Sequence, residues 1–192
     1  MRSKEREAEK KNASEKKEKS TAQNILGTIA YIIGVCVFVF LILHFVGQRT
    51  VVNGQSMENT LEDGDNLIVD KLSYRFRDPE RYDIIIFPGP EEFGQHPYYI
   101  KRIIGMPGET VQIKDGKVYI NDSETPLDDS FVSETPLGSF GPYEVPENCY
   151  FMMGDNRNNS KDSRYWKNTF VRFDQIVGKA VIRYFPSIKL LN

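Results

Sequence analysis

Hydrophobic residues in this chain form one long continuous run, followed by a series of short runs. The long run, "ILGTIAYIIGVCVFVFLILHFV", covers residues 25–46 and contains no Asp, Glu, Lys or Arg. As a helix rising about 1.5 Å per residue it would measure about 33 Å, enough to cross a hydrocarbon layer of about 30 Å. A cleavable signal peptide would have a shorter apolar region and a small-residue cleavage site, and neither is visible. The pattern therefore predicts a transmembrane helix over residues 25–46, in preference to a buried core helix.

The residues before this run carry charge and show no apolar periodicity. Residues 2–19 mix Lys, Arg and Glu, a composition typical of a disordered, solvated tail. Basic residues dominate this tail, whereas only Arg49 follows the run closely. Because basic residues favour the cytoplasmic side, we expect a cytoplasmic tail (1–24), a single span (25–46) and an extracytoplasmic domain (47–192).

The short apolar runs after residue 47 predict strands. "DNLIVDKL", "RYDIIIF", "YYIKRIIG" and "IVGKAVIRYF" are rich in Ile and Val, "CYFMMG" combines aromatic residues with Met, and Gly, Pro, Asp and Asn separate these runs. "TVQIKDGKVYIN" alternates on both sides of Asp115-Gly116, as a hairpin does. The fold class is therefore mainly β, an antiparallel sandwich or barrel. Residues 122–146 predict a long surface loop or part of a small cap insertion around 110–148.

The composition argues against a nucleic-acid partner, a disulfide in the domain, and a bound metal or cofactor. The net charge of −2 gives no basic field for nucleic acid. Cys36 lies in the long run and Cys149 is alone in the domain, so no disulfide is expected there. His44 and His96 stand far apart and no Cys/His cluster has zinc spacing, so neither a metal nor a cofactor is predicted.

Ser56 is the first candidate for chemistry. It follows Gly54-Gln55, and a Gly at that position lets the chain turn sharply and present the next side chain. A Ser near a Gly is usually only part of a turn, and a nucleophilic Ser needs a base. His96, in a polar loop before Pro97, is a surface residue on the simplest interpretation, although it is also a candidate base.

Lys101 is the other candidate base. Strand alternation in "YYIKRIIG" places Lys101 and Arg102 on opposite faces, so one of the two cations faces inward. Burial disfavours a charged amine and lowers the pKa of Lys, and a neutral amine accepts a proton from Ser. An edge-strand Lys with its amine in solvent is the more common situation.

The third candidate element is "MGDNRNNSKDSRYW", residues 153–166. It places Asp155, Arg157, Asp162 and Arg164 around Ser160. Opposite charges at this spacing predict a loop held by salt bridges and side-chain-to-backbone hydrogen bonds. Such a loop serves equally well as a structural element or as the wall of an active site, where Ser160 would orient the Lys101 amine.

Taken together, "GQSMENTL", "RYDIIIF", "KRIIGMPGE" and "GDNRNNSKDSR" resemble the ordered motifs of bacterial type I signal peptidases. The resemblance covers nearly the whole chain after the tail. It implies an antiparallel β catalytic core, of the kind that the self-cleaving repressors share, with a small β insertion. It also implies a bacterial plasma-membrane endopeptidase, without a cofactor and functional as a monomer, that removes signal peptides from exported preproteins.

The resemblance also assigns roles to residues. Ser56 is the implied nucleophile and Lys101 the implied general base, with Ser160 orienting Lys101. Asp162 and Arg164 brace the loop, supported by Asp155 and Arg157. The residues at positions that match the substrate-binding pockets, which favour small residues such as Ala, are Val52, Met57, Leu61, Leu67 and Ile100. Core packing is the competing interpretation for these five, above all for Leu61 and Leu67.

Three positions depart from the family pattern. Asn59 stands where the family often has Pro, and Glu109 stands where it often has Asp. Gly54 replaces a hydroxyl residue that supplies a second oxyanion donor in some members, which leaves the Ser56 backbone N–H as the one donor assigned from the sequence. None of these departures touches the predicted Ser/Lys pair.

Two other functions fit parts of the pattern. A self-cleaving Ser/Lys regulator would share the catalytic core, but such proteins are soluble and carry DNA-binding domains. A membrane-tethered β module that only binds a partner would require Ser56 and Lys101 to be incidental. Cleavage of other proteins, and its loss on Ser56→Ala, distinguishes a signal peptidase from both.

Overall fold

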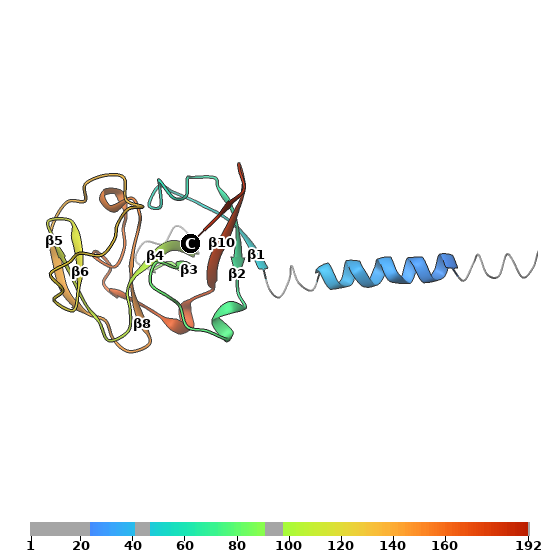
Figure 1. Cartoon of the computed structure of the whole chain (residues 1–192), viewed down its shortest axis with the longest axis horizontal. Helices are drawn as coiled ribbons and strands as arrows, with labels where there is room; N and C mark the ends of the chain where they lie inside the picture. Colours follow the sequence, from blue (N-terminus) through green and yellow to red (C-terminus); the bar gives the residue numbers. More distant parts are fainter. Residues whose placement is uncertain (1–23, 41–46, 91–97, 192) are drawn as a thin grey trace, which may run out of the picture. The chain divides into compact units, whose positions relative to one another are not determined.

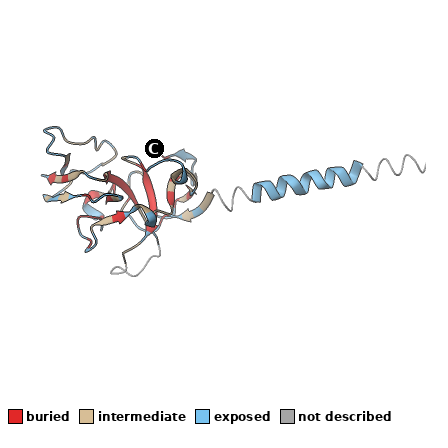
Figure 2. Ribbon diagram, turned by 90° about the horizontal axis from the view of Figure 1, so that it is seen from below, coloured by how far each residue is buried: buried red, intermediate tan, exposed pale blue. Residues whose placement is uncertain are grey.

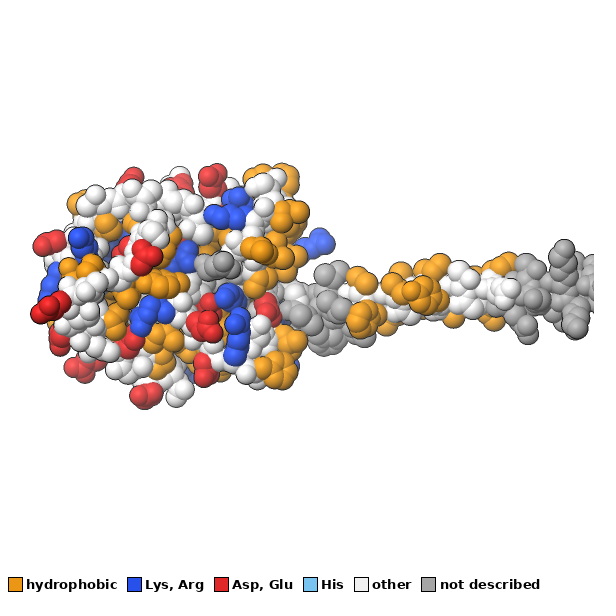
Figure 3. Space-filling view, in the orientation of Figure 1, with side chains coloured by type: hydrophobic (Ala, Val, Ile, Leu, Met, Phe, Trp, Pro, Cys, Tyr) orange, Lys and Arg blue, Asp and Glu red, His pale blue; other side chains and the backbone are white. Residues whose placement is uncertain are grey.

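The computed structural model describes residues 24–40, 47–90 and 98–191, in two compact units, Met1–His44 and Phe45–Asn192. The first unit contains a helix over residues 24–40, whose side chains are exposed and largely apolar (Figures 2 and 3). No helix within the described residues is both long enough and apolar enough to span a bilayer. The predicted tail and the end of the predicted span, residues 41–46, lie outside the described residues.

The second unit is built from short strands joined by turns and single-turn 3-10 helices (Figure 1). The strands are β1 (Gly47–Val51), β2 (Asn66–Asp70), β3 (Ile84–Pro88), β4 (Tyr98–Gly105), β5 (Thr110–Lys114), β6 (Lys117–Ile120), β7 (Phe140–Glu144), β8 (Cys149–Met153), β9 (Phe170–Arg172), β10 (Gly178–Phe185) and β11 (Lys189–Leu190). The 3-10 helices are η1 (Ser73–Arg75), η3 (Arg157–Asn159) and η4 (Phe173–Gln175). The prediction of a mainly β domain is confirmed.

One large antiparallel sheet forms the body of this unit. Its strands run in the order β1-β2-β10-β3-β4-β8-β9, and β11 pairs with β10. Each apolar run predicted to be a strand forms one. Lys101 of β4 lies opposite Ile85 of the preceding strand β3, and Arg102 lies opposite Met153 of β8, which is distant in sequence. The sheet therefore brings the "KRIIG" and "GDNRNNSKDSR" motifs side by side.

The central strands are buried on both faces, which explains their nearly continuous apolar sequence. In β3, Ile84 and Ile86 belong to one core cluster, whereas Ile85 and Phe87 belong to another. A third cluster contains Ile104 and residues of β5, β6 and β8. Because apolar side chains cover both faces of β4, any polar residue in this strand lies in a water-poor environment.

A second sheet, with strand order β6-β5-β7, lies between β4 and β8 in the sequence, and residues 110–148 are called the insertion below. Asp115 and Gly116 both have positive φ, +48° and +78°, as the two-residue turn of the β5–β6 hairpin requires. The segment predicted as a surface loop, residues 122–146, is irregular up to Ser139 and then forms β7, which pairs with β5. Gly138 precedes this strand and Gly141-Pro142 interrupt it, so the sequence pattern does not predict a strand here.

Candidate active site

Ser56 lies on a tight turn that leaves the edge of the large sheet just after β1. Gly54 takes a φ of +98°, a conformation that favours glycine, and its N–H donates to the Asp63 carboxylate at 2.7 Å. The chain then makes one helical turn, in which Leu61 N–H donates to the Met57 carbonyl at 2.8 Å. Met57 is anchored in the core, while Ser56 stays half-buried at the surface. The predicted sharp turn at Gly54 is present.

Lys101 reaches this turn from β4. Its Nζ lies 2.5 Å from Ser56 Oγ and 3.2 Å from the Ile100 carbonyl oxygen. The Lys101 side chain is only 4% exposed, and Tyr99 on the same strand has its ring centroid 5.5 Å from Nζ. A nucleophile candidate and a base candidate separated by 45 positions in the sequence are thus in direct contact.

Arg102, next to Lys101, is equally buried. Strand alternation predicted that only one of the two cations faces inward, and this expectation is wrong because β4 packs on both faces. Arg102 makes a bidentate ion pair with Asp155, with Nε–Oδ1 and Nη2–Oδ2 distances of 2.8 and 2.6 Å. The Arg102 side chain therefore faces a carboxylate, whereas Lys101 Nζ donates to a hydroxyl and to a carbonyl.

The environment of Lys101 lowers the pKa of its amine from 10.5 to about 8, chiefly because burial disfavours the charged form. The Asp162 and Asp155 carboxylates act in the opposite direction, and the Arg164 guanidinium assists the lowering. Since each of these carboxylates is already paired with an arginine, their pull on the Lys101 proton is weakened. A substantial fraction of Lys101 is consequently neutral near pH 8.

The loop after β8 is held by ion pairs, as predicted. Arg164 pairs with Asp162 through two contacts of 2.8 Å and donates to the Arg157 carbonyl at 2.7 Å. Asp162 also accepts a hydrogen bond from Gly154 N–H at 3.0 Å. The Asp162–Arg164 pair therefore fixes both ends of the loop that borders Ser56.

Asp155 and Arg157 have partners outside this loop. Asp155 pairs with Arg102 and also accepts from Thr60 Oγ1 at 2.6 Å, which joins it to the Ser56 turn. Arg157 makes a bidentate pair with Asp129 of the insertion, both contacts at 2.8 Å. Proximity along the chain suggested pairing within the loop, but these two residues connect it to β4, the Ser56 turn and the insertion.

Ser160 is buried beside the Ser56 turn. Its Oγ makes no hydrogen bond within the described part of the chain, so the expected contact with the Lys101 amine is not formed. Gly154 lies between the two serines: a Cβ at this position would overlap both the Ser56 carbonyl oxygen and Ser160 Oγ. Gly154 is therefore a requirement for close packing of this loop against the Ser56 turn.

Asn156 is a site residue that the sequence analysis did not identify. Its backbone N–H donates to the Ser56 carbonyl at 3.1 Å, and its side-chain amide donates to the Gln55 carbonyl and to Glu58 at 3.0 and 2.9 Å. Asn159 adds a bond to the Gln55 side chain at 3.2 Å. Asn156 and Asn159 in "GDNRNNS" were the available signal, but their targets lie about a hundred positions away in the sequence.

A groove of about 1000 Å³ opens beside Ser56 and Lys101. Of the five predicted substrate-binding residues, Val52, Met57 and Ile100 line this groove. Leu61 and Leu67 do not; both are fully buried in the core cluster under the Ser56 turn. Their position agrees with the core-packing interpretation. His96, the alternative base, lies outside the described residues.

Glu109, where the family often has Asp, closes the turn after β4. Its carboxylate accepts from Met106 N–H at 2.8 Å and forms an ion pair with Arg81. Arg81 also donates to the Ile104 carbonyl at 2.5 Å. The Glu109 side chain thus joins the turn after β4 to Arg81, which precedes β3.

Asn59 has a φ of +81°, which proline, fixed near −65°, does not adopt. We therefore predict that Asn59→Pro, although it restores a residue common in the family, destabilises the folded state by roughly 1–3 kcal/mol and lowers kcat/KM. Asn59→Gly, which permits positive φ, is the matched control and is expected to retain activity. Thermal unfolding and preprotein cleavage measure both effects; a more stable, fully active Asn59→Pro protein would contradict this backbone geometry.

Comparison with known proteins identifies the family to which this chain belongs. Residues 25–185 match the family model described as signal peptidase, peptidase S26. The chain belongs to this family. It is a serine hydrolase of the signal peptidase I type, and the resemblance inferred from its motifs is confirmed.

Individual relatives agree with the family model. The chain is 41% identical over 145 residues to the probable signal peptidase I-2 of Synechocystis sp., a match covering 74% of this chain and 65% of that protein. It is 36% identical over 180 residues to signal peptidase I P of Bacillus subtilis subsp. natto, covering 88% and 94%. A crystal structure of a signal peptidase I from Enterococcus faecalis V583 matches with 34% identity and a TM-score of 0.45, over 54% of this chain and 97% of that one.

Proposed function

We propose that this signal peptidase removes N-terminal signal peptides from exported preproteins with Ser56 as nucleophile and Lys101 as general base. The observation that carries the proposal is the 2.5 Å contact between Lys101 Nζ and Ser56 Oγ at the wall of an open groove. Burial, which lowers the pKa of the Lys101 amine to about 8, supports its role as base.

The reaction follows from these positions. The neutral Lys101 amine takes the Ser56 hydroxyl proton as Oγ attacks the scissile carbonyl, and the resulting tetrahedral oxyanion collapses to an acyl-enzyme. The proton on Lys101 passes to the leaving amine of the mature protein. The Lys101 amine, neutral again, then activates the water that hydrolyses the acyl-enzyme ester.

The oxyanion requires a donor that is not already engaged. Within the described residues, the Ser56 backbone N–H donates no hydrogen bond, whereas the Ser56 carbonyl accepts one from Asn156 N–H. The Ser56 N–H is therefore the donor we assign. Asp162–Arg164 and Asp155–Arg102 hold the surrounding loop and strand in place, and buried Ser160 packs next to the Ser56 turn.

The groove supports recognition of a small residue before the cut. Val52, Met57 and Ile100 give it an apolar wall, which we propose excludes bulky side chains. Val51 at the end of β1 and Tyr98 at the start of β4 also line the groove, and both residues are exposed. An extended signal peptide is proposed to lie there as an added strand, held by main-chain hydrogen bonds.

The proposal includes the arrangement of the chain in the cell. Residues 1–24 form the cytoplasmic tail, 25–46 the single span of a bacterial plasma membrane, and 47–192 the extracytoplasmic peptidase domain with its insertion around 110–148. Support comes from the charge-free apolar run and the exposed apolar side chains of helix residues 24–40. Ser56 would then stand about ten residues beyond the bilayer, where signal peptides arrive.

The pKa of Lys101 predicts a pH dependence. The active form has a neutral amine, so below pH 8 kcat/KM is expected to rise about tenfold per pH unit and to level off above the pKa of about 8. The sign follows because protonation at low pH removes the base. Cleavage rates of a detergent-solubilised preprotein between pH 5 and 10 measure this. A profile that is flat across pH 6 to 9 would rule out a base with this pKa.

The substrate assignment is tested with the full-length protein in detergent and a purified preprotein, with mass spectrometry of the products. The expected result is one cut after a small residue. Two substrate variants sharpen the test: a bulky residue at the cut position should block cleavage by exclusion, and Pro near the cleavage site should block strand addition because it lacks an N–H. Cleavage of this chain alone, with every preprotein left intact, would favour a self-cleaving regulator instead.

A further inference from the structure

One irregular segment of the insertion, residues 128–137, lies along the loop that borders Ser56. Asn158 joins the two: its side-chain oxygen accepts from Leu137 N–H at 3.0 Å, and its amide donates to the Thr135 carbonyl at 3.1 Å. No catalytic motif of the sequence includes this segment, which was predicted only as part of a surface loop. Its contacts nevertheless fall on the most highly charged loop of the site.

Asp129 makes the principal polar contact of this segment. Its two carboxylate oxygens each accept a hydrogen bond from Arg157, at 2.8 Å, in a bidentate pair. The Arg157 side chain is 1% exposed and that of Asp129 is 20% exposed. Asp129 therefore neutralises a buried arginine of the catalytic loop, from a position 28 residues away.

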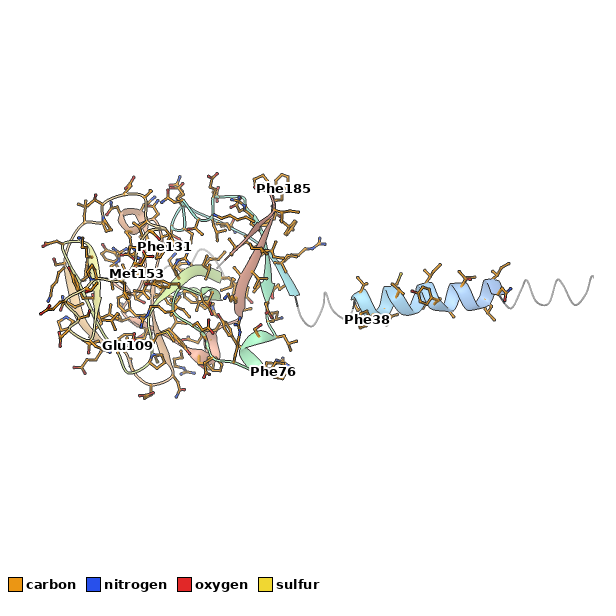
Figure 4. The ribbon with its side chains drawn as sticks, in the orientation of Figure 1. Phe38, Phe76, Glu109, Phe131, Met153 and Phe185 are labelled. Atoms are coloured by element: carbon orange, nitrogen blue, oxygen red, sulfur yellow. The ribbon has the colours of Figure 1, made fainter. Side chains whose placement is uncertain are left out.

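Phe131 makes the principal apolar contact. Its ring centroid lies 4.2 Å from the Arg102 guanidinium and 5.7 Å from that of Arg157, and Tyr82 packs against it edge-on at 5.7 Å. Phe131 also packs on the core cluster that contains Met153, at the end of β8 (Figure 4). One aromatic ring thus covers both arginines that hold the Gly154–Arg157 segment and limits their access to water.

Two chains of contacts connect these arginines to the turn that carries Ser56. Arg157 Nε donates to the Gly154 carbonyl at 3.2 Å, and Gly154 packs against the Ser56 carbonyl. Arg102 holds Asp155, which in turn accepts from Thr60 Oγ1 at 2.6 Å on the Ser56 turn. Both routes end on the turn that carries the nucleophile.

We propose that Asp129 and Phe131 are positioning residues for Ser56, so that the insertion holds the nucleophile against Lys101. This proposal rests on the Ser56/Lys101 function given above. It assigns to residues 128–137 a direct part in the rate of the chemical step. Neither residue lines the groove beside Ser56, so we expect binding of the preprotein to be independent of them.

Asp129→Asn in the full-length protein is the test, because it removes the charge at nearly constant shape. We expect kcat for preprotein cleavage to fall about tenfold or more, with KM unchanged, since small misplacement of a reacting group is costly. Asp128→Asn is the matched control, because Asp128 is exposed and its carboxylate accepts hydrogen bonds from Ser130. Asp129→Glu, which restores the charge, is expected to recover most of kcat.

Phe131→Leu provides a second, independent variant that removes the ring and keeps the apolar contact, and it is expected to lower kcat in the same way. A purely structural role predicts a different result, namely a lower melting temperature with kcat per folded molecule unchanged. The proposal is overturned if Asp129→Asn and Phe131→Leu both match Asp128→Asn in kcat. Such a result would leave the Ser56/Lys101 function intact, whereas failure of that function would appear as activity in Ser56→Ala.

Discussion

Replacing Lys101 with alanine is expected to lower kcat/KM for preprotein cleavage by about 10³-fold or more, a loss within the range of general-base catalysis. Ser56→Ala is expected to lose at least as much, and the double variant no more than either single variant, because the two residues act as one unit. The physical reason is the 2.5 Å contact between Lys101 Nζ and Ser56 Oγ. Without the amine, nothing else within the described site accepts the Ser56 proton.

Lys117→Ala serves as the control for this prediction. Lys117 is an exposed lysine of β6 in the insertion, and its loss is expected to leave kcat/KM unchanged. Melting curves of all variants confirm that they fold. If Lys101→Ala cleaves at a rate comparable to the wild type, the base is another residue, and His96 becomes the next candidate even if the substrate class is correct.

Gly154→Ala carries the second large expected effect. The added methyl group would overlap the Ser56 carbonyl oxygen and Ser160 Oγ, and the backbone atom cannot move away without displacing the nucleophile turn. We expect kcat to fall about 100-fold, because a displacement near 1 Å at a reacting group costs about that much. The melting temperature should fall as well, since the overlap lies in a buried loop.

Gly47→Ala is the matched control for Gly154→Ala. The nearest atom to a Cβ at Gly47 is a methyl group of Ile68 at 3.7 Å, an ordinary contact, so this variant is expected to keep its activity and stability. Steady-state cleavage and thermal unfolding are measured on both variants. A Gly154→Ala protein with wild-type kcat would show that the Ser56 turn is not packed against this loop as described.

The strands that carry the site were accessible to sequence reasoning because each has a strong local signal. Apolar runs bounded by turn residues predicted β2, β3, β4, β8 and β10, and Asp115-Gly116 predicted the β5–β6 hairpin. The strands that escaped prediction, β7, β9 and β11, are either three residues or shorter or, in β7, interrupted by Gly and Pro. Their pairing comes from partners elsewhere in the chain, and a local pattern does not contain that information.

The site residues likewise fall into those with a local sequence signal and those that depend on partners distant in the sequence. Ser56 and Lys101 were named from motifs, and burial of one cation in β4 followed from alternation, but burial of both followed only from a sheet covered on two faces. Leu61 and Leu67 show the limit of carrying over family positions, since they pack under the Ser56 turn and not along the groove. Asp129 had no local signal at all, because its partner Arg157 is distant in sequence.

The central claim is that Ser56 becomes covalently acylated with the help of Lys101. The most direct measurement is rapid acid quenching of the full-length protein during preprotein turnover, followed by proteolysis and mass spectrometry of the enzyme peptides. The account predicts a signal-peptide acyl group on the peptide containing Ser56 in the wild type, and none in Ser56→Ala or Lys101→Ala. Cleavage that continues in Ser56→Ala, or an acyl group found on any other residue, would contradict it.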